Sequence, residues 1–279
     1  MLLREEKLNR IYECEDTLEG ILSGIYQAWD ASYGHDYIHL TVPAAGGGES
    51  MLLFSEYHTV VPDAQQAQKV VQTIRKKTSE KVCEKLLGAL YSANPEKADA
   101  VYHILPQAFR MGWKVMENLT DPYVLAVFEM DRNVKHEAHE YLGFLRFEEQ
   151  KNGILLAKFS PGNDLLELVA PHFVDRFPGE NFVIYDTKRK KAAFHQQNSS
   201  FVIRGLSEEE LGRFFQISPK EAQFQAMWRL FFGTIAIKER ENKDLQRNLM
   251  PYHYRTYMTE MHPDAPETPY IHAAHPNIK

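Results

Sequence analysis

The stretch from Arg132 to His195 constrains the fold of this chain more than any other part of the sequence. It predicts a helix with a basic face, then two strands, a second helix and further strand sequence. E-E-Q-K-N-G separates the first two strands as a hairpin turn, and Pro178-Gly179 ends the second helix. This order predicts an α+β fold in which a small antiparallel sheet is flanked by helices.

The expected elements follow from periodicity and from helix-start signals. Leu119-Thr120-Asp121-Pro122 starts a helix, because Asp or Thr can cap it and Pro fits its first turn. Val61-Pro62-Asp63 precedes another helix in the same way. Strands are expected at 143–148, 153–159, 181–186 and 190–195, and helices at 79–92, 95–112, 121–141, 164–177, 207–216 and 219–239.

The N-terminal region is predicted to be mostly helical, with one short strand at 9–14. We place a soft boundary near residue 95, which gives regions 1–95 and 96–261, the second being the α+β core with the C-terminal helices. Residues 42–50 form a predicted glycine-rich loop. The tail 262–279 contains four prolines and is expected to be extended or disordered.

Composition limits the class of protein. Of 279 residues, 44% are hydrophobic and 12% aromatic, enough for a substantial core. No apolar run approaches the roughly 18–20 residues of a membrane span, and the opening M-L-L-R-E-E-K-L-N-R is charged too early for a secretory signal, so we expect a cytoplasmic protein. The net charge of −6 argues against nucleic acid coating the whole surface but allows one local basic patch.

One face of the predicted helix 121–141 is basic. Arg132, Lys135, His136 and His139 follow the spacing i, i+3, i+4 and i+7, while Val127, Val134, Ala138 and Tyr141 fall on the opposite face. The basic face is interpreted either as a contact for phosphates or as the solvated side of an amphipathic helix.

The sequence predicts no metal and no cofactor. Cys14 and Cys83 are the only cysteines, too few for a four-cysteine zinc site or an iron–sulfur cluster. His136 and His139 in H-E-A-H-E could share a metal, but the spacing is not H-E-x-x-H, and further ligands would have to come from elsewhere. Whether these histidines bind a metal stays open.

Aromatic and cationic side chains alternate near the C-terminal end of the chain. Trp228, Phe231, Phe232 and Ile235 form a helical stripe that is typical of a core. Arg247, Tyr252 and their neighbours are typical either of a surface on which bases stack or of a packed C-terminal segment.

Four segments together carry a family resemblance: I-Y-E-C-E-D-T-L-E-G-I-L-S-G-I-Y, R-N-V-K-H-E-A-H-E-Y-L-G-F-L-R-F, A-P-H-F-V-D-R-F-P and the W-R to P-Y-H-Y segment. The chain resembles DNA-metabolism and DNA-repair proteins that are encoded beside a radical-SAM protein. Their core domain has no assigned function and also occurs fused to uracil-DNA glycosylase-like domains. Two parts of the chain, His136 and G-T-I-A-I-K-E-R-E-N, depart from the family pattern. Both make the basic surface less positively charged.

The resemblance implies an accessory protein that binds nucleic acid and acts with a radical-SAM partner. The residues implied to contact nucleic acid are Arg132, Lys135, Arg146, His172, Arg176, Trp228, Arg229, Arg247 and Tyr252. One alternative is a glycosylase- or hydrolase-like enzyme that acts on a nucleobase or nucleotide, with Glu137 and His139 as general acid and base. The other is a protein-binding scaffold without catalysis, marked by a large exposed apolar patch.

Overall fold

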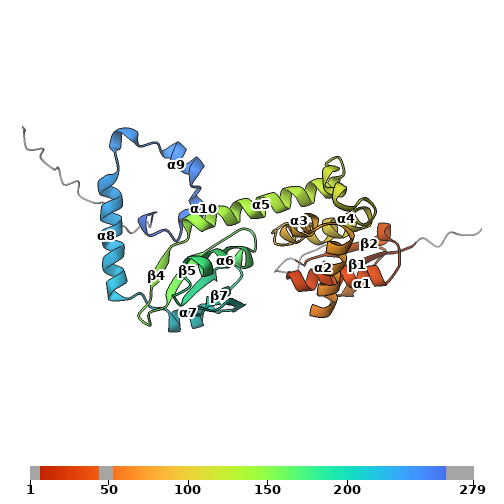
Figure 1. The fold of residues 1–279 in the computed structure, drawn as a ribbon, viewed down its shortest axis with the longest axis horizontal. Helices are drawn as coiled ribbons and strands as arrows, with labels where there is room; N and C mark the ends of the chain where they lie inside the picture. The colour runs from red at the N-terminus through yellow and green to blue at the C-terminus, as the bar shows by residue number, and fades with distance from the viewer. Residues whose placement is uncertain (1–6, 44–52, 262–279) are drawn as a thin grey trace, which may run out of the picture. The chain divides into compact units, whose positions relative to one another are not determined.

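The computed structural model describes residues 7–43 and 53–261, which form two compact units (Figure 1). The N-terminal unit runs to Glu137 and includes Gly162–Asp164; the C-terminal unit contains 138–161 and the residues from Leu165 onward. The division falls inside a helix, whereas the sequence places its boundary near residue 95. Within the described ranges, no helix combines the length and the apolar character needed to cross a membrane.

The N-terminal unit is built on a parallel three-stranded sheet. Strand β1 (Asn9–Glu13) lies between β2 (Ile38–Thr41) and β3 (Ser55–Thr59). Helix α1 (Leu18–Asp30) begins after Thr17, whose hydroxyl accepts a hydrogen bond from the Gly20 amide. Helix α2 (Ala64–Lys77) begins after Asp63, as expected from Val61-Pro62-Asp63, because this carboxylate accepts from two first-turn amides.

Two further helices and the first part of a third complete the core of this unit. Helices α3 (Glu80–Leu90) and α4 (Lys97–Met111) confirm the two helices expected there, and short 3₁₀ turns lie at His35–Tyr37 (η1) and Gly112–Glu117 (η2). The buried side chains of α1 to α4 and the sheet form one continuous apolar cluster with Val124, Val127 and Met130 of the next helix. The N-terminal region is therefore mostly helical, as predicted.

Helix α5 (Pro122–Phe144) is the amphipathic helix that the sequence predicts. Asp121 caps it, since its Oδ1 accepts hydrogen bonds from the amides of Tyr123 and Val124. The predicted apolar face is buried at Val127, Val134, Ala138 and Tyr141, and the predicted basic face is exposed at Arg132, Lys135, His136 and His139.

The C-terminal unit contains a five-stranded sheet in the order β4-β5-β6-β7-β8. Its strands are β4 (Phe147–Glu149), β5 (Leu155–Phe159), β6 (Phe182–Asp186), β7 (Lys191–His195) and β8 (Phe201–Gly205). Neighbouring strands are antiparallel except β5 and β6, which run parallel because helix α6 (Leu166–Arg176) connects them. The predicted α+β class with a small, mainly antiparallel sheet is confirmed.

Both faces of this sheet are covered, so that all five residues of β6 are buried. On one face, Phe182 joins an aromatic cluster with Phe147 and with Phe173 of α6. On the other face, Val183 and Tyr185 pack with Leu211 of helix α7 (Glu208–Phe214). Alternate residues of a strand point to opposite faces, which explains why V-I-Y reads as continuously apolar.

Helix α8 (Pro219–Ile235) corrects one expectation from the sequence. Trp228, Phe231, Phe232 and Ile235 were expected in a core, but each is between 36% and 56% exposed, and no residue of α8 is buried. The chain then passes through η3 (Lys238–Arg240), α9 (Lys243–Leu249), α10 (Tyr252–Arg255) and η4 (Thr259–Met261). Figure 1 shows α8 standing beside β4 at the edge of the sheet.

Three strands were not predicted: β2, β3 and β8. Strand β3 has no buried residue and β8 none either, so neither shows the apolar alternation that marks a half-buried strand. The predicted tail 262–279 and most of the predicted loop 42–50 lie outside the described residues.

Candidate functional site

A hollow with three basic side chains lies in the C-terminal unit, where β4, β5, α8 and the segment before η4 meet. Its volume is about 530 Å³. We call it the cationic hollow; it is lined by Arg146, Glu148, Lys158, Ile217, Gln225, Arg229, Thr256, Tyr257, Met258 and Thr259. The edge of the sheet, α8 and the segment before η4 thus bring together residues that are far apart in the sequence.

Two of the cations in the hollow lack an acidic partner. Lys158 on β5 and Arg229 on α8 are both half-buried, and within residues 7–43 and 53–261 neither forms an ion pair or a side-chain hydrogen bond. Removing such charges from water is unfavourable unless an opposite charge approaches them. Lys158 and Arg229 therefore leave positive charge in the hollow that an anion can neutralise.

Arg146, the third cation, is held in place by Glu260. Its Nη2 lies 2.7 Å from Glu260 Oε1, and its Nη1 donates to the carbonyls of Gly143 and Leu145. The Trp228 indole N–H donates to the other carboxylate oxygen at 3.2 Å. Burial alone would raise the pKa of Glu260, but the hydrogen bonds and charge of Arg146 outweigh it and lower that pKa. Glu260 is consequently ionised and orients both Arg146 and Trp228.

Acidic and amide groups on the opposite wall are already hydrogen-bonded. Gln225 Nε2 donates to Glu148 Oε1 and to Glu221 Oε1, each at 3.1 Å. Glu221 Oε2 in turn accepts from the Glu149 amide of β4. These bonds fix α8 against the sheet edge and limit the movement of the Glu148 carboxylate.

The structure brings together three of the nine residues that the sequence predicted to contact nucleic acid. Arg146 and Arg229 line the hollow, and Trp228 adjoins it through Glu260. The other six, which are exposed, do not line it: Arg132, Lys135, His172, Arg176, Arg247 and Tyr252. Lys158 was missed, because a lysine within a strand carries no distinctive pattern. Tyr257, which also lines the hollow, belongs to the run of cations and aromatic residues around Tyr252 that the sequence analysis interprets either as a stacking surface or as a packed segment.

Two of these outlying residues form ion pairs within the described residues. Lys135 Nζ lies 2.7 Å from the buried Asp131 carboxylate, and Arg247 pairs with Asp244 on α9 at 2.9 Å. Arg132 of the predicted basic face makes no ion pair within the described part of the chain and is exposed to solvent.

The two residues predicted to be catalytic have different environments. Glu137 is half-buried, and its carboxylate accepts hydrogen bonds from the Gly162 amide at 2.6 Å, the Asn163 amide at 3.0 Å and Asn163 Nδ2 at 2.6 Å. His139 is exposed two residues further along α5, where side chains diverge by about 200°. This geometry gives Glu137 an anchoring role, and the catalytic roles of both residues stay predictions.

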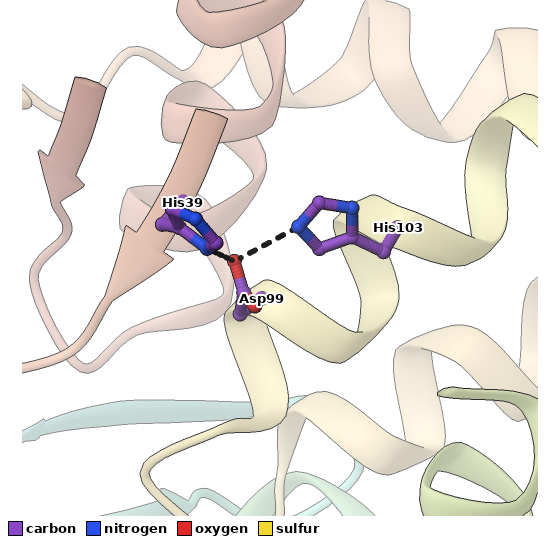
Figure 2. A group of neighbouring side chains, drawn as sticks. All are labelled: His39, Asp99 and His103. Atoms are coloured by element: carbon purple, nitrogen blue, oxygen red, sulfur yellow. Dashed lines mark ion pairs between the residues drawn. The ribbon is translucent and has the colours of Figure 1, made fainter. Parts of the chain in front are cut away.

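A second polar cluster, which the sequence did not indicate, lies in the N-terminal unit. Figure 2 shows His39 from strand β2 and His103 from α4 both directed at Asp99, one helical turn before His103. His39 Nδ1 and His103 Nε2 each lie 3.4 Å from Asp99 Oδ1. The same oxygen accepts a hydrogen bond from the Leu40 amide at 3.0 Å. His39 is far from Asp99 and His103 in the sequence, so no local motif contains all three residues.

The electrostatics of this cluster favour a charged carboxylate. Burial would raise the pKa of Asp99, but the close approach of the His103 and His39 rings, the charge of His103 and the hydrogen bond from the Leu40 amide together hold it far below its ordinary range. The hydrogen bond to Asp99 raises the pKa of His39 despite partial burial of the ring. The cluster therefore presents one carboxylate and two imidazoles at a shared point.

Comparison with known families shows to which family the chain belongs. Residues 95–260, more than half of the chain, match DUF4130, a domain of unknown function. The chain therefore belongs to the DUF4130 family. The matched segment contains every residue that lines the cationic hollow, together with Asp99 and His103, whereas His39 lies outside it. No curated protein matches the chain.

Proposed function

We propose that this protein binds single-stranded nucleic acid through the cationic hollow and acts in DNA metabolism or repair beside a radical-SAM protein. The observation that carries the proposal is the pair Lys158 and Arg229, two half-buried cations without acidic partners in the described residues. The DNA context and the radical-SAM partner come from the family resemblance.

Phosphate is the anion that fits these residues best. Arg229 and Arg146 carry planar guanidinium groups that match phosphate oxygens in pairs, and Lys158 supplies a compact point charge. Glu148 and Glu260 offset part of the positive charge, so the hollow can hold only a few phosphates. This local patch is compatible with the net charge of −6.

Aromatic rings beside the cations favour unpaired bases over a duplex. Tyr257 is partly exposed and lines the hollow, and its hydroxyl donates to Thr187 Oγ1 at 3.4 Å. Trp228 is 43% exposed and lies beside the Phe231 ring. Bases of a single strand can stack on such rings while their phosphates contact the cations.

The test is a fluorescence-anisotropy titration with single-stranded, duplex and uracil-containing DNA at low and moderate salt. We expect the single strand to bind best at low salt, and the Lys158→Ala/Arg229→Ala variant to bind at least tenfold more weakly. Lys220→Ala/Lys243→Ala is the matched control, because both lysines are exposed cations of the same unit outside the hollow. Absence of wild-type binding, or equal loss in the control, overturns the proposal.

The exposed apolar side chains of α8 favour a second candidate function, the binding of a protein partner. The helix presents Phe224, Met227, Trp228, Leu230, Phe231 and Ile235, each at least 43% exposed. An apolar face of this kind is typical of a protein interface. The radical-SAM protein implied by the resemblance is the partner we propose for it.

Co-expression with that radical-SAM protein tests the second candidate. Phe231→Ser/Ile235→Ser should reduce co-purification, whereas Val202→Ser, which alters an equally exposed apolar residue on β8, should not. A complex that survives the α8 variant, or self-association of the chain through α8 in light scattering without the partner, contradicts this assignment.

A further inference from the structure

We propose that His39, Asp99 and His103 form a binding site for a divalent first-row transition-metal ion in the N-terminal unit. The three side chains come from two elements, strand β2 and helix α4, that pack against each other. Two imidazoles and one carboxylate form a ligand set that suits zinc and the neighbouring metals, with at least one position left open.

The distances between the ligand atoms match those around such an ion. Bonds of about 2.0–2.1 Å in tetrahedral geometry separate neighbouring ligand atoms by about 3.3–3.4 Å. His39 Nδ1 and His103 Nε2 each lie 3.4 Å from Asp99 Oδ1, and all three ligand atoms lie within 4.8 Å of one another. An ion therefore fits with small rotations of the side chains and no movement of the backbone.

One ligand atom lacks a hydrogen-bond partner. His103 Nε2 is inaccessible to solvent and makes no hydrogen bond within the described part of the chain, although it lies near Asp99. Buried polar atoms of folded proteins almost always have a partner. A metal ion bound at this nitrogen would satisfy it.

Neighbouring groups hold two of the ligands in orientation. The Leu40 amide donates to Asp99 Oδ1 at 3.0 Å, which fixes the carboxylate and leaves a further lone pair for a metal. The His103 ring stacks on Tyr123, with centroids 4.7 Å apart and planes 20° apart. Neighbouring groups that orient the ligands in this way are a regular feature of metal sites in proteins.

The site has an approach from solvent. His103 forms part of the wall of an open hollow of about 660 Å³, together with His35, Gln107 and Asp121. The His39 side chain is itself 38% exposed. A fourth ligand, water or an anionic substrate group, can therefore reach the ion from the exposed side of His39, which distinguishes an open site from a closed structural one.

The test is calorimetric titration of the full-length, chelator-treated chain with Zn²⁺, repeated with Fe²⁺ under anaerobic conditions. We expect one ion per chain and a loss of affinity of at least about 100-fold in His39→Gln, which exceeds the loss caused by removing a group that only orients a ligand. Asp99→Asn, which keeps an oxygen for the Leu40 amide, should weaken binding as well. His58→Gln is the matched control, because His58 is a similarly exposed histidine on β3 of the same sheet, outside the cluster.

Bound Co²⁺ provides an independent readout, since a tetrahedral site absorbs strongly in the visible range. The wild-type spectrum should disappear in His39→Gln while circular dichroism confirms that the variant is folded. Binding that persists in His39→Gln and disappears in His136→Ala/His139→Ala overturns the proposal and moves the site to α5. Absence of stoichiometric binding of both Zn²⁺ and Fe²⁺ to the wild type also overturns it.

Discussion

The ammonium group of Lys135 lies 2.7 Å from the carboxylate of Asp131, one turn earlier on α5. The Asp131 side chain is 3% exposed, and its nearest other cation is Lys85 at 3.6 Å. Gly88 leaves room for this carboxylate, since a Cβ there would come within 2.1 Å of Asp131 Oδ1. Lys135 therefore neutralises a buried charge, whatever else it contacts.

Lys135→Ala is expected to lower the free energy of unfolding by about 1–2 kcal/mol, because a charged hydrogen bond to a buried carboxylate is lost while Lys85 remains. Urea denaturation measures this. Arg132→Ala on the same exposed face should change stability by less than about 0.5 kcal/mol. Equal stability of both variants would show that Lys135 is not needed to neutralise Asp131.

Substitutions of Glu137 and His139 should differ in their effect on the free energy of unfolding, again measured by urea denaturation. Glu137→Ala removes three hydrogen bonds to Gly162 and Asn163, so we expect a loss of about 1–3 kcal/mol. His139→Ala removes an exposed side chain and should be nearly neutral. If Glu137→Ala left stability unchanged, the anchoring role would be wrong and a catalytic role for Glu137 would gain weight.

The Arg146–Glu260 pair should contribute to stability in a pH-dependent way. The pKa of Glu260 is lowered from 4.5 in the folded protein, so its contribution is complete above pH 4.5 and is lost as the pH falls through the folded-state pKa. Stability measured from pH 7 down to pH 3 should decline less steeply in Glu260→Gln. Glu241→Gln, which changes an exposed acid, is the control. Parallel curves of stability against pH for Glu260→Gln and the wild type would show that the Arg146–Glu260 pair does not contribute in this way.

The exposed side chains of α8 should contribute little to folding. Phe231→Ser is expected to change the free energy of unfolding by at most about 0.5 kcal/mol, whereas a core phenylalanine replaced by a small residue costs about 3–5 kcal/mol. Phe182→Ser, on the fully buried β6, supplies that comparison. A large loss of stability in Phe231→Ser would show that this side chain is packed in a core, as expected from the sequence.

Local patterns explain which parts of the fold could be predicted. The caps Asp63 and Asp121 and the buried Val134 of α5 are encoded within one or two turns, so their helices were found. Strand β3 pairs with β1 through backbone contacts and buries no side chain, so its sequence carries no signal. The apolar stripe of α8 was found, but periodicity does not distinguish a core from an exposed apolar face.

The sites were harder to predict than the elements. Arg146, Trp228 and Arg229, which the resemblance implies as contacts for nucleic acid, lie in or beside the hollow, and their contact with nucleic acid stays a prediction. Lys158 joins them by the register of β5, and His39 meets Asp99 only because β2 packs on α4. Contacts of this kind depend on tertiary structure and cannot be predicted from the local spacing of residues.

The salt dependence of binding to single-stranded DNA measures most directly whether the cationic hollow contacts phosphate. Each phosphate contact contributes about −0.7 to the slope of log K against log salt concentration. We expect a slope about 1.4 units shallower in Lys158→Ala/Arg229→Ala than in the wild type, with Lys220→Ala/Lys243→Ala unchanged. Equal slopes for the wild type and the hollow variant would mean that Lys158 and Arg229 contact no phosphate, and the proposed function would be wrong.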